Sequence, residues 1–414
     1  MSVEIVHPLP IEALEGWART MAITFLDSPE AEDQRRWRDA MRLLWTPEHY
    51  WGARDGDQWV GTLGASTQGL TVPGTDARIP ADALTMVTVA ATHRRRGLLT
   101  TMLTDSLTTA RDRGDAVSML WAAEWAIYWR FGYAPATVNV EYTLNPRRPG
   151  ARIEAGGDGT VRQVSAERLS EVGPAIFDRA AGQRGGHLQR TPRWWSFSLG
   201  LDGFPESLVD GKPPIGILHE GPDGPDGFLR WVPKGSGDAD GVQVVDFCTA
   251  SDAAYRGLWH YLTSMDLVET IAIGHRPIDE PLRWLLPDGR ALHIDSALDG
   301  LWLRLLDVPA ALSARRYAVE DRLVLEVVDD DIGGFAAGRY VLDGGPDGAK
   351  CQASTVDTPD LRVHQRALAM AYLGGTSLHG QAIAGRVEEL TPGALRRADA
   401  LFMTPAAPWC ATGF

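Results

Sequence analysis

The sequence predicts a mixed α/β (α+β) protein of three domains, of which the first two are related. Three observations lead to this prediction. At roughly 150 residues per domain, 414 residues correspond to two or three hydrophobic cores. Apolar residues at helical spacing alternate along the chain with short strand-like runs bounded by Gly, Pro and Asp. A strand–turn–helix–strand unit also occurs twice. We therefore expect domains at residues 1–150, 151–300 and 301–414.

The first segment contains the largest number of predicted elements. Apolar spacing predicts helices over residues 11–25, 30–45 and about 94–113, and strands over residues 58–67, 81–90, 116–122 and 138–144. The Asn-Pro-Arg-Arg-Pro-Gly stretch at residues 145–150 can continue neither a helix nor a strand. This stretch marks the predicted end of the first domain.

The second segment repeats the order of the first. A strand at 244–250, a helix at 251–265 and a strand at 268–273 match the unit around residues 87–122. Alignment of Arg96-Gly97-Leu98 with Arg256-Gly257-Leu258 gives an offset of 160 residues. The matching order of elements predicts a tandem duplication.

The third segment has a pattern of its own. Strand-like runs at 322–328 and 338–344 precede helical stretches near 359–372 and 393–403. The three aspartates at residues 329–331 lack the spacing of a calcium loop and are expected to form a solvated turn.

The composition excludes several classes of protein. The net charge of −14 argues against nucleic-acid binding and is compatible with cationic small molecules. Three distant cysteines without a Cys-x-x-Cys pair form neither a disulfide framework nor a zinc ribbon, and they favour a reducing, cytoplasmic compartment. No signal-peptide pattern and no apolar run of about 18 residues is present, so no membrane partner is expected. The ten histidines show no ligand spacing, and no metal is expected.

The stretch Val-Thr-Val-Ala-Ala-Thr-His-Arg-Arg-Arg-Gly-Leu-Leu-Thr at residues 87–100 carries the sharpest chemical signal. A strand leads into a tight turn and a helix N-terminus, where unpaired N–H groups and the helix dipole favour anions. The arginines add charge, and Gly97 allows a phosphate to approach the backbone. The motif therefore predicts a diphosphate-bearing cofactor, with a solvated basic helix start as the alternative. No Walker A or strand–GxGxxG–helix unit is present, which disfavours nucleoside triphosphates and NAD.

These residues resemble the phosphate motif of the Gcn5-related N-acetyltransferases (GNAT), with Leu99 in place of the last small residue. The chain is more closely similar to the Eis (enhanced intracellular survival) family. It has Thr-His-Arg-Arg-Arg-Gly-Leu-Leu at 92–99, Ile-Tyr-Trp-Arg-Phe-Gly-Tyr-Ala-Pro-Ala-Thr at 127–137, and Phe414 as its last residue. The resemblance covers essentially the whole chain.

The resemblance implies two tandem GNAT folds followed by a sterol-carrier-protein-like domain. It also implies acetyl-CoA-dependent N-acetylation of cationic amines, with aminoglycosides as acceptors and several positions acetylated, and a homohexamer. A protein-lysine acetyltransferase, or a hydrophobic-ligand carrier using the third domain, are the alternatives.

The resemblance also assigns the acetyl-CoA site residue by residue. The pantetheine arm pairs with the strand Val87, Thr88 and Val89. The pyrophosphate is held by Arg95, Arg96, Gly97, Leu98, Leu99 and Thr100. Ala123 and Glu124 line the opening for the thioester, with Ala123 where the family usually has Ser.

The acid and the base follow from the same resemblance. Tyr128 is the expected acid because a phenol stays protonated at neutral pH; its alternative is a role in an aromatic core, and Tyr133 competes for the role of acid. The terminal carboxylate of Phe414 is the expected base, and the alternative is a frayed chain end. Gly413 stands where family members often carry an acidic residue.

Four residues resemble the family's acceptor pocket: Phe25, Asp27, Trp37 and Met86. Carboxylates and aromatic faces suit ammonium groups. The alternatives are helix core for Phe25 and Trp37 and a helix cap for Asp27.

The second copy has lost the basic run. In the alignment above, Ala254 and Tyr255 stand where Arg94 and Arg95 do, and Asp252 replaces Thr92. A carboxylate near the phosphate position disfavours an anion. We therefore expect one acetyl-CoA site per chain, in the first domain.

Overall fold

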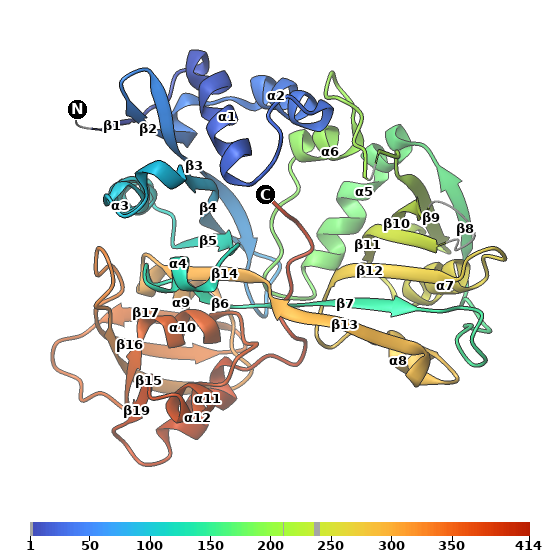
Figure 1. Ribbon diagram of the computed structural model, residues 1–414. Helices are drawn as coiled ribbons and strands as arrows, with labels where there is room; N and C mark the ends of the chain where they lie inside the picture. Colours follow the sequence, from blue (N-terminus) through green and yellow to red (C-terminus); the bar gives the residue numbers. More distant parts are fainter. Residues whose placement is uncertain (1–2, 210, 236–240) are drawn as a thin grey trace.

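The computed structural model describes residues 3–209, 211–235 and 241–414 (Figure 1). The described strands form two seven-stranded sheets and one five-stranded sheet. This confirms the mixed α/β class and a third unit distinct from two similar ones.

The first repeat places helices and strands close to where the sequence predicts them. Its elements are β1 (Glu4–Val6), α1 (Leu14–Thr24), α2 (Glu32–Leu44), β2 (Tyr50–Asp55), β3 (Gln58–Thr71), β4 (Arg78–Val89), α3 (Leu98–Arg113), β5 (Val117–Trp121), α4 (Trp125–Trp129) and β6 (Ala134–Pro135). β1, β2, α4 and β6 are additions to the prediction. The helix predicted from residue 94 begins only at Leu98, because Gly97 in the left-handed region (φ 82°) is its N-cap. The three arginines therefore lie in the loop that precedes α3.

The second repeat has the same order of elements. It comprises β7 (Val138–Leu144), β8 (Thr160–Val164), α5 (Ala166–Ala181), α6 (Pro192–Leu199), β9 (Ile215–Gly221), β10 (Gly224–Lys234), β11 (Gly241–Thr249), α7 (Asp252–Thr263), β12 (Thr270–Arg276), α8 (Leu282–Leu285) and β13 (Leu292–Asp299). In both repeats an edge strand (β1 or β8) is followed by two helices and then by three antiparallel strands. A helix then connects the third of these strands to a parallel neighbour. The duplication is thus confirmed at the level of topology.

The predicted alignment of the two copies is wrong in detail. The N-cap of α7 is Ser251, whose hydroxyl accepts a hydrogen bond from the amide of Ala254. Gly257 lies in the middle of α7, where a Cβ would collide with the ring of His219. When the two helices are aligned at their N-caps, Ser251 therefore corresponds to Gly97. The shared Arg-Gly-Leu tripeptide lies at the start of α3 but in the middle of α7.

The two repeats exchange a strand, which changes the predicted domain boundaries. The first sheet has the order β1-β2-β3-β4-β5-β14-β6 and the second β13-β7-β12-β11-β10-β9-β8. β7 pairs with β12 and β13 of the second sheet, and β14 (Leu301–Leu305) pairs with β5 and β6 of the first. The Pro- and Gly-rich stretch at 145–150 ends a strand of the second sheet and does not mark the border between domains.

The exchanged strands form one antiparallel ribbon that runs through both sheets (Figure 1). Gly300 lies between β13 and β14, where a Cβ would overlap the hydroxyl of Thr137. The same hydroxyl accepts a hydrogen bond of 2.7 Å from the amide of Leu301. The close approach of the two backbones at this point explains the glycine.

The third unit follows β14 and packs against the first sheet. It contains α9 (Val308–Ala314), β15 (Asp321–Val328), β16 (Gly338–Gly345), β17 (Gly348–Ala353), β18 (Leu361–His364), α10 (Gln365–Tyr372), α11 (Leu378–Ile383), β19 (Val387–Glu389) and α12 (Ala394–Phe402). The helix predicted over 359–372 is in part a strand, because buried Leu361 and Val363 alternate with exposed neighbours. One hydrophobic core joins this unit to the first sheet, with Leu303 of β14 among its members.

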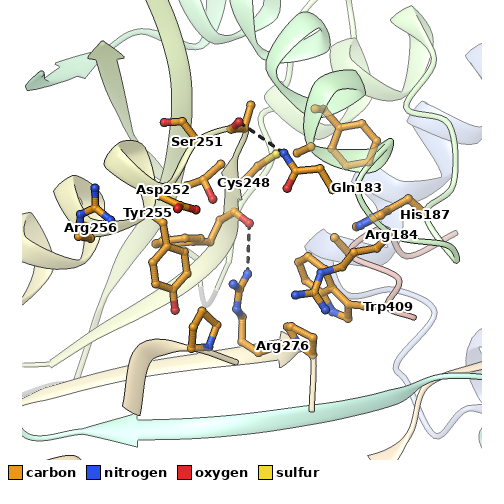
Figure 2. Close-up of a pocket in the computed structure, with 18 of the residues that line it drawn as sticks. Gln183, Arg184, His187, Cys248, Ser251, Asp252, Tyr255, Arg256, Arg276 and Trp409 are labelled. Carbon is orange, nitrogen blue, oxygen red and sulfur yellow. Dashed lines mark hydrogen bonds between the residues drawn. The ribbon is translucent and has the colours of Figure 1, made fainter. Parts of the chain in front are cut away.

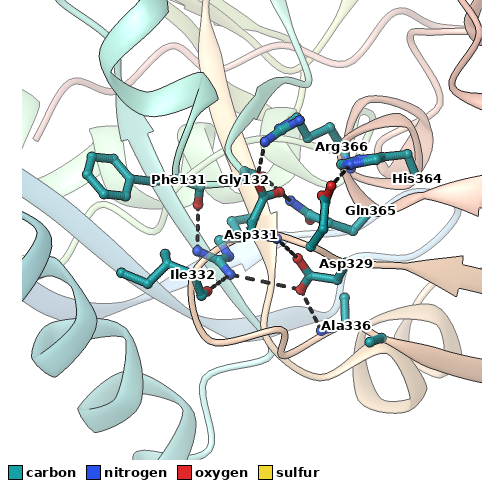
Figure 3. A network of polar contacts seen from close by, with 12 residues as sticks. Phe131, Gly132, Asp329, Asp331, Ile332, Ala336, His364, Gln365 and Arg366 are labelled. Carbon is teal, nitrogen blue, oxygen red and sulfur yellow. Dashed lines mark hydrogen bonds and ion pairs between the residues drawn. The ribbon is translucent and has the colours of Figure 1, made fainter.

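The aspartates at 329–331 are not a solvated turn (Figure 3). The side chains of Asp329 and Asp331 are buried, and only Asp330 is exposed. Asp329 lies 3.9 Å from the guanidinium of Arg304 on β14, and Asp331 pairs with Arg366. Buried carboxylates require such partners. The Asp329–Arg304 pair ties the third unit to the first sheet, and the Asp331–Arg366 pair lies within the third unit.

The structure also describes the three cysteines and the apolar character of the helices. All three cysteines are buried free thiols, and burial raises the pKa of Cys248 and Cys410 to about 12. Among the described residues, no helix has both the length and the apolar composition that a membrane crossing requires.

Candidate active site

The site begins at an irregularity in β4. The register with β3 pairs Thr88 with Thr62 and Thr85 with Gly64, so that two residues, Met86 and Val87, oppose one. Met86 has a φ of 54°, and its carbonyl accepts a 2.7 Å hydrogen bond from the Thr62 hydroxyl. Such a bulge bends a strand and redirects its edge. β4 pairs with β5 only over residues 81–83, and beyond this point the two strands diverge.

The loop after β4 has the backbone geometry of an anion cradle. Arg95 (φ 63°) and Gly97 (φ 82°) are both left-handed, and a Cβ at Gly97 would meet no atom within 4 Å. The first amides of α3, at Leu98, Leu99 and Thr100, have no carbonyl partner within the helix. Left-handed residues followed by a helix N-terminus aim several N–H groups at one point, which suits a phosphate.

The bulge, the loop and the diverging strands surround one cavity of about 690 Å³. Ten of the predicted cofactor residues line it: Val87, Thr88, Val89, Arg95, Gly97, Leu98, Leu99, Thr100, Ala123 and Glu124. Arg96 does not, since its guanidinium turns back to the carbonyl of Thr92 at 3.3 Å. Thr24, Thr85, Trp121 and Arg130 also line the cavity, although the sequence did not single them out.

Tyr128 and Tyr133 occupy different environments. Tyr128 lines the cavity from α4 with 7% of its surface exposed, and burial together with the nearby Glu124 raises its pKa to about 12. The phenol is therefore protonated at neutral pH. Tyr133 is fully buried outside the cavity lining, and its hydroxyl shares a 2.6 Å hydrogen bond with Ser118.

The end of the chain reaches the same cavity. Residues 405–414 leave the third unit and run between the two large sheets (Figure 1). The hydroxyl of Thr85 donates a 3.2 Å hydrogen bond to a terminal oxygen of Phe414, and Phe414 lines the cavity with Tyr128. A Cβ at Gly413 would meet no atom within 4 Å.

An arginine of the second repeat holds this segment. Arg190, 6% exposed, donates to the Thr412 hydroxyl at 3.1 Å and to the Ala411 carbonyl at 3.4 Å. Its guanidinium also makes two bonds to the carboxylate of Asp246, at 2.9 and 3.1 Å. A planar guanidinium held in this way has little freedom, so it fixes the chain two residues before Phe414.

The four predicted acceptor residues divide into two pairs. Phe25 and Met86 line the cavity. Asp27 lies after α1, accepts a 3.2 Å hydrogen bond from Gln34, and does not cap α2, whose N-cap is Ala31. Trp37 packs half-buried against the core between α1 and β2. Neither Asp27 nor Trp37 belongs to the described lining of the cavity.

The second repeat also contains diverging strands, but here side chains bond to the backbone of both strands. β11 and β12 pair over residues 241–244 and 270–273 and then separate. Trp409 of the C-terminal segment donates its indole N–H to the carbonyl of His275 at 2.6 Å. Arg276 donates to the carbonyl of Phe247 on β11 at 3.3 Å. Where β11 and β12 diverge, each strand thus has one backbone carbonyl occupied by a side chain.

Among the described residues, one group has the side chains for a metal ion. Ligand atoms of Asp330, Asp331 and His364 lie within 4.8 Å of one another. Asp331 pairs with Arg366, and the ring Nδ1 of His364 accepts the amide of the same arginine. This group belongs to the third unit and lies outside the lining of the 690 Å³ cavity.

Three family matches follow the architecture. A GNAT acetyltransferase domain matches residues 6–136, a second GNAT acetyltransferase domain matches residues 186–305, and a sterol carrier protein domain matches residues 308–411.

Full-length relatives extend this result. An N-acetyltransferase of Streptomyces griseus, described as uncharacterized, is 37% identical over 99% of both chains. N-acetyltransferase Eis of Mycobacterium tuberculosis is 33% identical over 92% of both chains. The crystal structure of Eis1 from Mycobacterium abscessus superposes with a TM-score of 0.83 at 34% identity, covering both chains completely.

The chain belongs to the Eis family of GNAT N-acetyltransferases. A GCN5-related N-acetyltransferase from Anabaena variabilis, 19% identical with a TM-score of 0.85, shares the fold. The first two units are therefore GNAT domains and the third is sterol-carrier-protein-like, as the resemblance implies. GNAT acetyltransferases use acetyl-CoA, so this Eis-family chain is an acyltransferase of that class.

Proposed function

We propose that this chain transfers the acetyl group of acetyl-CoA to amines of polycationic small molecules, with aminoglycosides as the acceptor class. One observation carries the proposal. The anion cradle before α3, the phenol of Tyr128 and the terminal carboxyl group of Phe414 all line one cavity.

The cavity residues fit acetyl-CoA at both ends. The amides of Leu98, Leu99 and Thr100, with Arg95 beside them, offer donors to a pyrophosphate. The edge of β4 beyond residue 83 is free of β5 and offers backbone groups to the amides of a pantetheine arm.

Acetyl-CoA supplies the acetyl thioester. The acceptor nitrogen attacks the carbonyl carbon, a C–N bond forms, the C–S bond breaks, and the electron pair of that bond stays on sulfur. Tyr128 donates its proton to the thiolate, since its raised pKa of about 12 keeps the phenol protonated. The carboxylate of Phe414 accepts the proton that the nitrogen loses, directly or through one water.

The acceptor class follows from charge and from the family. The chain carries a net charge of −14, and Glu124 and the Phe414 carboxylate are anionic groups in the cavity lining. Phe25 and Trp121 add aromatic faces that attract ammonium groups. A substrate with several amines can present them to the same site in turn, which supports acetylation at several positions.

Thiol release from acetyl-CoA tests the proposal. The purified chain is assayed with a panel of aminoglycosides, a linear polyamine, lysine peptides and no acceptor. We expect thiol release with aminoglycosides well above the control without acceptor, and mass spectrometry to show more than one added acetyl group. Release with lysine peptides alone would indicate a protein-lysine acetyltransferase. No release with any acceptor would contradict the proposal and leave the carrier role of the third domain as the alternative.

A further inference from the structure

The second GNAT domain contains a cavity of its own (Figure 2). It measures about 410 Å³, within the usual range for small-molecule sites. It lies at the carboxyl ends of β11 and β12 and at the start of α7, the place that corresponds to the catalytic cavity of the first domain. Arg276 occupies the carbonyl of Phe247 on β11, and Trp409 occupies the carbonyl of His275 on β12, so these two carbonyls already have donors.

Cationic side chains outnumber anionic ones in the lining of this cavity. Arg184, Arg256 and Arg276 line it, with Asp252 as the one carboxylate among the described lining residues. Arg184 forms an ion pair with Asp279, and Arg276 forms one with Glu280. No described carboxylate lies within ion-pair distance of Arg256. One guanidinium at the cavity therefore lacks a counter-charge from the described part of the chain.

A buried imidazole provides a second, independent indication of a ligand. His187 is 3% exposed, lines the cavity and points toward it in Figure 2. Its Nδ1 has no hydrogen-bond partner among the described residues. Burial and the surrounding arginines lower its pKa to about 3, so the ring is neutral. An unsatisfied buried polar atom costs free energy and indicates a missing partner.

The remaining wall is apolar. Phe177 and Trp409 flank the His187 ring edge-on, at centroid distances of 5.7 and 5.1 Å, and Phe247 and Leu285 complete the wall. A ligand that fits has an anionic group for Arg256 and the amides at the start of α7, and a short apolar body for these faces.

We propose that the second GNAT domain binds a small organic carboxylate with an apolar body in the cavity whose lining includes Arg256, His187 and Trp409. This site is distinct from the catalytic cavity, and it does not depend on the identity of the acetyl acceptor.

Calorimetry with 4-bromobenzoate tests the proposal, with 4-bromobenzamide as the neutral isostere. We expect the full chain to bind the carboxylate and to bind the amide at least tenfold more weakly. Arg256→Gln is expected to weaken carboxylate binding at least tenfold. Arg396→Gln, which removes an exposed arginine of α12, is the matched control and binds as the original chain does. Ala180→Phe, which fills the cavity, abolishes binding of both probes.

Melting temperatures establish that each variant is folded before its binding is compared. Anomalous diffraction from the bromine locates the probe, and we expect the peak in this cavity. The proposal is overturned if the original chain does not bind 4-bromobenzoate at 10 mM. It is also overturned if Arg256→Gln binds this probe as tightly as the original chain does, or if the bromine peak lies in the catalytic cavity. A bromine peak without binding in solution indicates binding at crystal concentration only and overturns it as well.

Discussion

At the scale of single residues, the difference between Tyr128 and Tyr133 is one of surroundings. Tyr128 lines the cavity, whereas the hydroxyl of Tyr133 is engaged by Ser118 outside it. We expect Tyr128→Phe to lower kcat by roughly 10²-fold, because general acid catalysis typically contributes that much or more. Tyr133→Phe is the matched control and should retain most of the activity. Steady-state kinetics decide between them, and unchanged turnover in Tyr128→Phe would remove this residue from the mechanism.

Arg190 acts on the reaction only through the C-terminal segment. Its bonds to Ala411 and Thr412 lie outside the lining of the catalytic cavity. We expect Arg190→Gln to lower kcat roughly tenfold, as the loss of charge-assisted hydrogen bonds predicts, with the affinity for acetyl-CoA unchanged.

A second variant separates positioning from stability in this case. Arg190→Gln leaves the Asp246 carboxylate without its partner, which destabilises the fold. Adding Asp246→Asn removes that charge and should restore the melting temperature without restoring kcat. Recovery of both together would show that Arg190 is only structural.

Asp82 gives the stability of the protein a pH dependence. Burial raises the pKa of this carboxyl group to about 7, although Ser118 and Arg113 bond to it. The folded state therefore holds a proton that the unfolded state releases near pH 4. The resulting stabilisation is complete below about pH 4 and is lost as the pH rises through 7.

Asp82→Asn removes this titration. Three pKa units correspond to about 4 kcal/mol, so we expect the variant to gain up to that amount relative to the original chain between pH 4 and pH 8. Urea unfolding at both pH values measures the difference. A parallel pH dependence in the two proteins would show that Asp82 does not titrate in this range.

At the scale of elements, the sequence predicts the repeated unit well and its irregularities poorly. Apolar spacing locates α1, α2, β3, β4 and β5 because each buries one face in a core. The bulge at Met86 has no such signal, because its positive φ is imposed by β3 and by the Thr62 hydroxyl.

In the candidate site, too, some residues can be predicted from the sequence and others are brought in only by the fold. The loop residues carry their chemistry in their type and spacing, so the motif at 92–99 identifies the phosphate end. Thr85 and Trp121 line the cavity only because β4 and β5 diverge beside them. Asp27 and Trp37 were assigned by resemblance, and their place outside the cavity lining depends on how the α1–α2 loop folds, which residue type does not reveal.

The exchanged ribbon depends on one glycine. A Cβ at Gly300 overlaps the Thr137 hydroxyl, which also holds the amide of Leu301. We expect Gly300→Ala to destabilise the chain by about 1–3 kcal/mol, the usual result of overpacking. Gly413→Ala, where a Cβ meets open space, is the control. Equal unfolding midpoints in denaturant for the two variants would contradict the role of Gly300.

At the scale of the whole molecule, the two GNAT domains differ in what occupies their diverging strands. The first domain has its anion cradle before α3, and in the second Arg276 bonds to β11 and Trp409 bonds to β12. We expect one equivalent of acetyl-CoA per chain. Titration calorimetry measures this stoichiometry, and two equivalents would show that the second cleft opens. Arg95→Gln should weaken the binding without changing the stoichiometry.

The strand exchange also determines when the first sheet can be completed during synthesis of the chain. The first sheet lacks β14 until residue 305 has been synthesised, although all its other strands have been synthesised by residue 135. At 5–20 residues per second the ribosome needs roughly 10–30 s to cover this interval. During that time the apolar edge of β5 has no partner strand, and an open edge of this kind invites pairing with other chains. The first sheet of a nascent chain is thus completed only after the second domain has been synthesised, and faster translation shortens the time during which the β5 edge is open.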